Sequence, residues 1–184
     1  KVFHLIIFPA HQEPYEVLRD SFSALAESNY PLDRFIVVLA AEERAGGAAS
    51  VTAEKIQREF GKLFFRFLIT KHPVNLPNEI PGKGSNETWA AKQAKSLIID
   101  PEQIAPEDIL VSVFDADTQI GKDYFGILTH KFLSVPKRHN ASYEPVPLFV
   151  NNILQAPAFA RVIAFSTTFW QMMQQSRREE LTTF

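Results

Sequence analysis

The sequence has no cysteine, which excludes disulfide bonds and metal sites built on thiolates. A bound metal ion would therefore have to be held by oxygen or imidazole ligands. The sequence also lacks a surplus of either charge: 19 lysine and arginine residues stand against 21 aspartate and glutamate residues, for a formal net charge of -2. Proteins that bind a nucleic-acid backbone usually carry a basic surplus, so we expect no nucleic acid as a partner.

Long apolar runs are missing as well. The stretch from Val2 to Phe8 is too short to span a membrane or to form a signal peptide of the usual layout. Hydrophobic residues make up 46% and charged residues 22% of the 184 residues, which is the balance of a folded globular protein. The length suits one domain, and the chain begins within a predicted strand, so we expect residues 1–184 to form a single domain cut from a longer protein.

Short apolar runs predict four β-strands, at residues 2–8, 35–41, 64–70 and 109–114. Apolar residues at helical spacing predict helices after Pro14 and at about residues 51–60, 86–99, 124–134 and 158–178, with Asp123 as the cap of the helix at 124–134. The polar, proline-rich residues 71–84 predict a surface loop. Strands that alternate with helices predict the α/β class, as a three-layer α/β/α sandwich around an open, mostly parallel sheet. In such sheets, ligands bind beyond the carboxyl ends of the strands.

Asp115-Ala116-Asp117 follows the last predicted strand directly and is the most specific chemical motif in the chain. Alternation along the chain leaves both carboxylates at the strand end, where one divalent cation can reach them. Mg²⁺ and Mn²⁺ prefer such oxygen ligands and keep phosphate oxygens as further partners. A solvated acidic turn would have the same sequence, but the position after a buried strand favours a metal site.

Gly82-Lys83-Gly84-Ser85-Asn86 opens the third predicted helix. Backbone N–H groups at a helix start, together with the charge of Lys83, suit an anion such as phosphate. The segment is not a Walker loop, because the glycines and the lysine do not have the required spacing. A plain glycine turn with a surface lysine is the alternative interpretation.

The ends of the first two strands carry further candidates. Pro9, His11 and Glu13 follow the first strand, and Glu13 is placed to accept hydrogen bonds from a ribose. Glu42 and Glu43 follow the second strand, where a carboxylate can read a base or a ribose. Simple solvated acids remain the alternative at both places, since an acidic residue near a helix N-terminus is favoured by the helix dipole alone.

In chain order, these four features resemble the family 2 glycosyltransferases of the GT-A fold, and the resemblance covers essentially the whole chain. Pro9, Glu13 and Pro14 match the segment that ends the first strand in that family, while His11-Gln12 replace its usual aromatic residue and asparagine. Glu42 stands near the position of the family's base-reading aspartate. The chain resembles membrane-associated bacterial members of that family.

The other matches lie at the start of the third predicted helix and after the fourth strand. Gly82, Lys83 and Asn86 match a Gly-Lys-small-x-Asn element that lies beside the sugar nucleotide in relatives. Asp115 and Asp117 match the Asp-x-Asp element. The resemblance implies that a nucleotide-diphosphate sugar, a UDP-sugar foremost, is bound by Pro9, His11, Glu13, Glu42, Lys83, Asn86 and Asp115. It also implies that Asp115 and Asp117 hold Mg²⁺ or Mn²⁺.

The activity implied by the resemblance is the metal-dependent transfer of a sugar to an acceptor hydroxyl, with inversion at the sugar carbon. The implied acceptor is a carbohydrate or a lipid-linked molecule, as in polysaccharide biosynthesis. The implied location is cytoplasmic, at the inner face of the membrane in the parent protein, with attachment through parts outside this chain. The family's general base follows in a Thr-Glu-Asp triplet that this sequence does not contain. We therefore assign no catalytic residue, expect the base beyond Phe184, and expect this piece to be weakly active or inactive.

Two other functions stay open. A nucleotidyltransferase also pairs acidic residues with a nucleotide, but it usually has a glycine-rich loop after the first strand, and residues 9–14 contain no glycine. A non-catalytic module that binds a sugar nucleotide or a protein is the other alternative. Near the end of the chain, Phe165, Phe169, Met172 and Met173 form an apolar helical stripe, which favours packing in a core over contact with a membrane surface.

Overall fold

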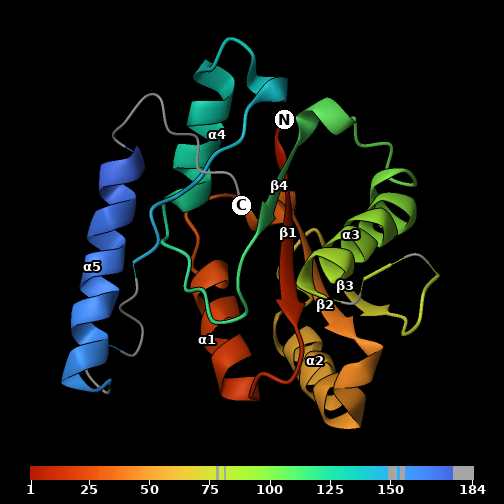
Figure 1. Ribbon diagram of the computed structural model, residues 1–184. Helices are drawn as coiled ribbons and strands as arrows, with labels where there is room; N and C mark the ends of the chain where they lie inside the picture. The colour runs from red at the N-terminus through yellow and green to blue at the C-terminus, as the bar shows by residue number, and fades with distance from the viewer. Residues whose placement is uncertain (78, 81, 149–152, 154–155, 176–184) are drawn as a thin grey trace. The chain divides into compact units, whose positions relative to one another are not determined.

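Four parallel strands form the central sheet (Figure 1). The computed structural model describes residues 1–77, 79–80, 82–148, 153 and 156–175. The strands are β1 (Phe3–Ala10), β2 (Phe35–Glu42), β3 (Arg66–His72) and β4 (Ile109–Val113), and they lie in the order β3-β2-β1-β4. Every pairing among these strands is parallel. The predicted α/β class with an open parallel sheet is confirmed.

The α-helices of the described chain are α1 (Tyr15–Ala26), α2 (Gly46–Phe60), α3 (Lys83–Ala94), α4 (Tyr124–Ser134) and α5 (Ala158–Gln175). Helix α3 continues into a π-helical turn, η3 (Lys95–Ile99). Short 3-10 turns lie at η1 (Leu32–Arg34), η2 (Glu43–Ala45), η4 (Pro106–Asp108) and η5 (Arg138–Asn140). Backbone contacts divide the chain into two units, Lys1–His139 and Asn140–Phe184, and each is described by itself. The single domain expected for residues 1–184 stays a prediction.

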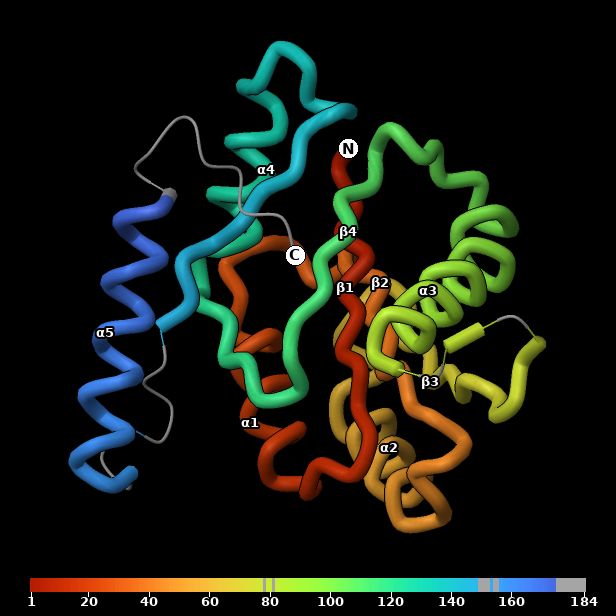
Figure 2. The backbone as a smooth tube through the Cα atoms, viewed as in Figure 1, coloured from red at the N-terminus to blue at the C-terminus, as the bar shows by residue number. Residues whose placement is uncertain are grey.

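The strand order places a topological switch between β1 and β4. The chain runs from β1 outward to β2 and β3, and then returns to place β4 against the opposite edge of β1 (Figure 2). The strand order therefore reverses beside β1, and the segments that follow β1 and β4 both leave the sheet at its carboxyl edge. Open α/β sheets bind their ligands in the crevice that such a switch creates.

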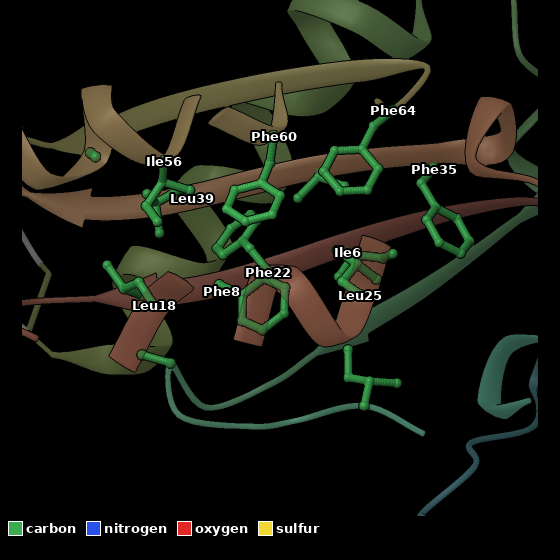
Figure 3. Packing of buried hydrophobic residues seen from close by; sticks show 14 of the residues in the cluster. Ile6, Phe8, Leu18, Phe22, Leu25, Phe35, Leu39, Ile56, Phe60 and Phe64 are labelled. Atoms are coloured by element: carbon green, nitrogen blue, oxygen red, sulfur yellow. The ribbon is translucent and has the colours of Figure 1, made fainter. Parts of the chain in front are cut away.

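Different helices cover the two faces of the sheet. Alternate residues of the central strands point to opposite faces, and both sets are buried. On one face, the strands pack against α1, α2 and α4, in a cluster that includes Ile6, Phe8, Phe22, Leu39 and Ile56 (Figure 3). On the other face, they pack against α3 and η3, in a cluster that includes Leu5, Ile7, Ile36, Val38 and Ala90. These are the three layers expected from the alternation of strands and helices.

Several element boundaries differ from the predictions by a few residues. Helix α2 begins at Gly46, earlier than predicted, because glycine is tolerated in a first turn whose N–H groups have no helical partners. The predicted loop at 71–84 is shorter, since β3 continues to His72 and α3 begins at Lys83. Asp123 occupies the predicted cap position of α4, but its Oδ1 accepts a hydrogen bond from Asn29 Nδ2 at 2.7 Å and it does not cap the helix backbone.

Helix α5 is the main described element of the unit Asn140–Phe184. It leaves Phe165, Phe169 and Met172 between 54% and 63% exposed. The interpretation of this stripe as core packing is therefore wrong for the described chain. The predicted end of this helix, residues 176–178, lies outside the described residues. None of the described helices has the length and apolar character needed to cross a membrane.

Candidate functional site

A cleft of about 500 Å³ opens at the carboxyl ends of β1, β2 and β4. It is lined by Pro9, Ala10, His11, Glu13, Pro14, Val17, Glu42, Lys83, Asn86, Asp115, Ala116 and Asp117. Every residue predicted from the sequence to bind the nucleotide sugar or the metal lies in this lining. Ala10, Pro14, Val17 and Ala116 complete the wall without having been predicted as site residues, because small and apolar wall residues carry no chemical signature.

The register of the sheet explains why distant parts of the sequence meet here. β1 and β2 are paired up to Ala10 and Ala41, and β1 and β4 are paired up to Ile7 and Val113. The segments that follow these pairs leave the sheet together at its carboxyl edge. The cleft therefore lies at the switch point between β1 and β4, where this architecture binds ligands.

In the turn after β4, one residue is buried in the core and the two residues beside it line the cleft. The N–H of Thr118 donates to the carbonyl oxygen of Asp115 at 2.9 Å and closes the turn. Ala116 is buried and belongs to the core cluster beneath α1. Asp115 and Asp117, which flank it, both line the cleft. Two carboxylates of the predicted motif thus share one cavity.

A buried hydroxyl supports this turn from the inner side. The hydroxyl of Ser21, in α1, donates a hydrogen bond to the carbonyl oxygen of Ala116 at 2.8 Å. Ser21 is fully buried. Sequence reasoning missed it, because a small residue beside Phe22 on a helix reads as ordinary packing and no local spacing links it to residue 116.

Lys83 contributes a positive charge to the lining of the cleft. Its Nζ forms an ion pair with the carboxylate of Asp115 and lies 3.9 Å from Oε1 of Glu87. The hydrogen bond with Asp115 raises the pKa of Lys83, partial burial opposes this, and the charges of the neighbouring carboxylates raise the pKa further. Lys83 is therefore a fixed positive charge. Because the pair is exposed to solvent, it is weak and can be exchanged for a phosphate.

Glu87 adjoins this pair and was not predicted as a site residue. Burial raises the pKa of the Glu87 carboxyl, the charge of Asp115 raises it further, and the charge of Lys83 lowers it. The available signal was the spacing of four residues from Lys83 on α3, which brings two side chains to the same helix face. Glu87 adds negative charge beside the cleft.

Asn86 joins α3 to the sheet beneath the cleft. Its Nδ2 donates to the carbonyl oxygen of Ala40, in β2, at 2.7 Å, and the residue is 1% exposed. Its Oδ1 has no hydrogen-bond partner among the described residues. One residue earlier, Ser85 Oγ accepts the N–H of Gly82 at 3.0 Å and caps the helix start. Asn86 therefore anchors the helix whose first turn carries Lys83.

The ends of β1 and β2 add acidic groups. Glu13 Oε2 accepts a hydrogen bond from the backbone N–H of His11 at 2.6 Å, and Glu42 forms an ion pair with Arg44. Of the two neighbouring acids at the end of β2, Glu42 is the one that lines the cleft. Glu43 Oε2 instead accepts the N–H of Val74 at 3.1 Å and fastens the loop that follows β3.

The donor set fits a particular kind of metal ion. Asp115 and Asp117 offer carboxylate oxygens, which Mg²⁺ and Mn²⁺ prefer. No group of three or more histidine or acidic side chains among the described residues could hold an ion by itself. The pair therefore suits an ion that keeps phosphate and water oxygens as ligands, and it does not suit a structural zinc enclosed by four side chains.

Taken together, these groups can bind an anionic ligand at the lysine and the helix start, and can hydrogen-bond polar ligand groups at the ends of β1 and β2. A comparison with models of protein families gave no match, and a comparison with curated proteins gave none either. The predicted membership of family 2 therefore stays a prediction.

Proposed function

We propose that this chain is the donor-binding part of a metal-dependent glycosyltransferase, which transfers a sugar from a nucleotide-diphosphate sugar to an acceptor hydroxyl. One observation carries the proposal: the polar side chains at three strand ends and one helix start line a single cleft at the switch point of the sheet. At about 500 Å³, the cleft falls within the range of small-ligand sites.

Each part of the cleft suits one part of such a donor. The first turn of α3 and Lys83 suit the diphosphate, because the positive end of a helix and a lysine both attract anions. Glu13 and Glu42 suit the ribose or the base, because their carboxylates accept hydrogen bonds from hydroxyl and N–H groups. The sugar then lies toward the open side of the cleft.

Asp115 and Asp117 are the residues that would hold Mg²⁺ or Mn²⁺. Such an ion, when bound, stabilises the negative charge that builds up on the departing diphosphate. Lys83 adds a second positive charge to the same place. Transfer with inversion, a carbohydrate or lipid-linked acceptor, and a parent protein at the cytoplasmic face of a membrane belong to the same proposal.

A second candidate is a module that binds the donor without catalysing transfer. The observation that favours it is the sequence after the acidic turn, which contains no Thr-Glu-Asp triplet to supply a general base. A general base is worth roughly 10² to 10⁴ in rate, so the chain should bind the donor and turn it over poorly. Binding and turnover must therefore be measured separately.

Thermal unfolding with a panel of nucleotides and Mn²⁺ tests the proposal. A ligand that binds only the folded state stabilises it by about 2.7 kcal/mol at one hundred times its dissociation constant. We expect a sugar nucleotide with Mn²⁺ to raise the melting temperature, and expect Asp117→Asn to remove the metal-dependent part. Glu107→Gln is the matched control, because it removes an exposed carboxylate in η4, before β4.

The outcomes separate the alternatives. Stabilisation by nucleoside triphosphates in preference to sugar nucleotides would favour a nucleotidyltransferase. No stabilisation by any nucleotide, with Mg²⁺ or with Mn²⁺, would refute the donor site.

A further inference from the structure

The loop between β4 and α4, residues 114–123, carries both aspartates of the cleft and is fastened to α1 and the residues after it. Near the start of the loop, the hydroxyl of Ser21 donates to the carbonyl oxygen of Ala116 at 2.8 Å. Near its end, the backbone N–H of Asn29 donates to the carbonyl oxygen of Lys122 at 2.9 Å. The loop is therefore held at both ends by the same segment of the chain.

The hydroxyl of Ser21 lies near two acceptors. The carbonyl oxygen of Val17, one turn back in α1, is 3.3 Å away, and that of Ala116 is 2.8 Å away. Serines inside helices commonly donate to the carbonyl one turn back, which satisfies the hydroxyl within the helix. Here the shorter bond goes to the loop. Ser21 therefore links α1 to the loop at a point from which water is excluded.

The bond acts at the residue between the two aspartates. A constraint on the carbonyl of Ala116 fixes the orientation of the peptide that joins it to Asp117. The Ala116 side chain is buried against the same core, and the N–H of Thr118 closes the turn on Asp115. With the backbone held from the inner side, the two flanking carboxylates remain in the cleft wall.

Helix α1 also contributes to the wall of the cleft. It begins directly after Pro14, and Val17 lies in its first turn; both residues line the cleft. The helix therefore connects the end of β1, where the ribose and base are proposed to bind, to the acidic loop, where the metal and diphosphate are proposed to bind.

We propose that Ser21 is a positioning residue, whose buried hydroxyl holds the acidic loop so that Asp115 and Asp117 are arranged for a divalent ion before it binds. This inference rests on the proposed function of the cleft. Outer partners that orient metal ligands typically contribute about 10- to 100-fold to metal affinity. Ser21→Ala, which removes the hydroxyl, should therefore weaken Mn²⁺ binding by about tenfold or more.

The experiment measures Mn²⁺ binding by electron paramagnetic resonance in the presence of UDP, together with hydrogen exchange of residues 114–118 in the metal-free protein. Ser23→Ala is the matched control, because it makes the same change two residues along the same helix. Ser21→Thr keeps the hydroxyl and should retain the affinity that Ser21→Ala loses. Circular dichroism establishes that each variant is folded.

Weaker Mn²⁺ binding by about tenfold in Ser21→Ala, faster exchange of the Thr118 amide, and little change in Ser23→Ala would support the proposal. Affinity within twofold of the unsubstituted protein would overturn it and leave the proposed function intact. If the unsubstituted protein does not bind Mn²⁺ with UDP, the proposed function fails. The hydrogen-exchange measurement then tests the role of Ser21 separately. If the amides of residues 114–118 are equally protected in Ser21→Ala, the hydroxyl does not hold the loop.

Discussion

Lowering the pH should destabilise this protein through His4. The side chain of His4, on β1, is fully buried. Its ring lies against those of Tyr30, Phe35 and Phe125, with centroids 4.8, 5.8 and 4.9 Å away, and Nε2 is 2.9 Å from Oγ1 of Thr129. Burial lowers the pKa of His4 from its ordinary value of 6.5 to about 4, because the apolar surroundings disfavour the charged imidazolium.

The sign and size of the effect follow from proton linkage. Below pH 6.5 the unfolded chain takes up a proton at this histidine, while the folded protein does not do so until about pH 4. The unfolded state therefore gains stability as the pH falls, and the free energy of unfolding decreases. The two pKa values give a loss of about 1.4 kcal/mol at pH 5.5 and about 3 kcal/mol at pH 4. Such a loss is a large part of the stability of a typical domain.

Urea unfolding at pH 7.0 and pH 5.5 measures this loss, and His4→Phe isolates it. The phenyl ring preserves the aromatic contacts and does not titrate. The difference in stability between pH 7.0 and pH 5.5 should therefore shrink by about 1.2 kcal/mol relative to the unsubstituted protein, because about 0.2 kcal/mol of the loss is already present at pH 7.0. The contributions of all other groups cancel in this comparison. His130→Gln, which replaces an exposed histidine in α4, is the control for the substitution of a histidine as such. Equal pH dependence in the unsubstituted protein and in His4→Phe would refute the reasoning.

Three further predictions concern the cleft and α5. Lys83→Gln should weaken UDP binding by about tenfold or more in calorimetry, because a charge-assisted contact to the diphosphate is lost. Asn86→Ala should lower the free energy of unfolding in urea by about 1–3 kcal/mol, because a buried carbonyl of β2 loses its partner. Replacing Phe165 and Phe169 by serine should reduce the binding of an apolar fluorescent dye, because both rings are exposed.

Each of these predictions has a control. Lys92→Gln removes a lysine from the same helix outside the cleft and should not affect UDP binding. Lys92→Gln should also change the free energy of unfolding by less than about 0.5 kcal/mol, as is usual for a surface substitution. The larger loss expected for Asn86→Ala is compared with this value. Val37→Ala, in the buried core, should not reduce dye binding, so a loss of dye binding in all variants would contradict the assignment to α5.

Much of the fold could be predicted because its signals are local. Each central strand is a continuous apolar run, as a strand buried on both faces requires, and the helices between them repeat apolar residues at helical spacing. The cleft could be predicted for a related reason: in a parallel sheet, residues that end successive strands must gather at one edge. Placing Asp115 and Glu42 needed no knowledge of side-chain packing.

The contacts that hold the site together could not be predicted in the same way. The bond from Ser21 to Ala116 joins residues 95 positions apart, and nothing near either residue indicates the other. Asp123 stands where a helix cap belongs, but its tertiary partner Asn29 competes with the helix backbone for the carboxylate. Local rules predict which residue types occupy a position. They do not predict which of several possible hydrogen bonds the fold selects.

The charge balance of the cleft predicts that the proposed metal ion and the proposed nucleotide bind cooperatively. Glu13, Glu42, Asp115 and Asp117 line the cleft, and Lys83 is the lysine placed against them. A diphosphate that binds without a metal ion is repelled by the net negative charge of these side chains. A divalent ion that binds without the diphosphate has only the two carboxylates of Asp115 and Asp117 as protein ligands. The ion therefore supplies positive charge for the diphosphate, and the diphosphate supplies further oxygen ligands for the ion. Each should bind weakly alone and more tightly when the other is present. Linkage requires the two enhancements to be equal, because both describe the same coupling free energy. The ion pair between Lys83 and Asp115 is compatible with this prediction, because an exposed pair is weak. A metal ion bound by Asp115 would leave Lys83 available to a phosphate.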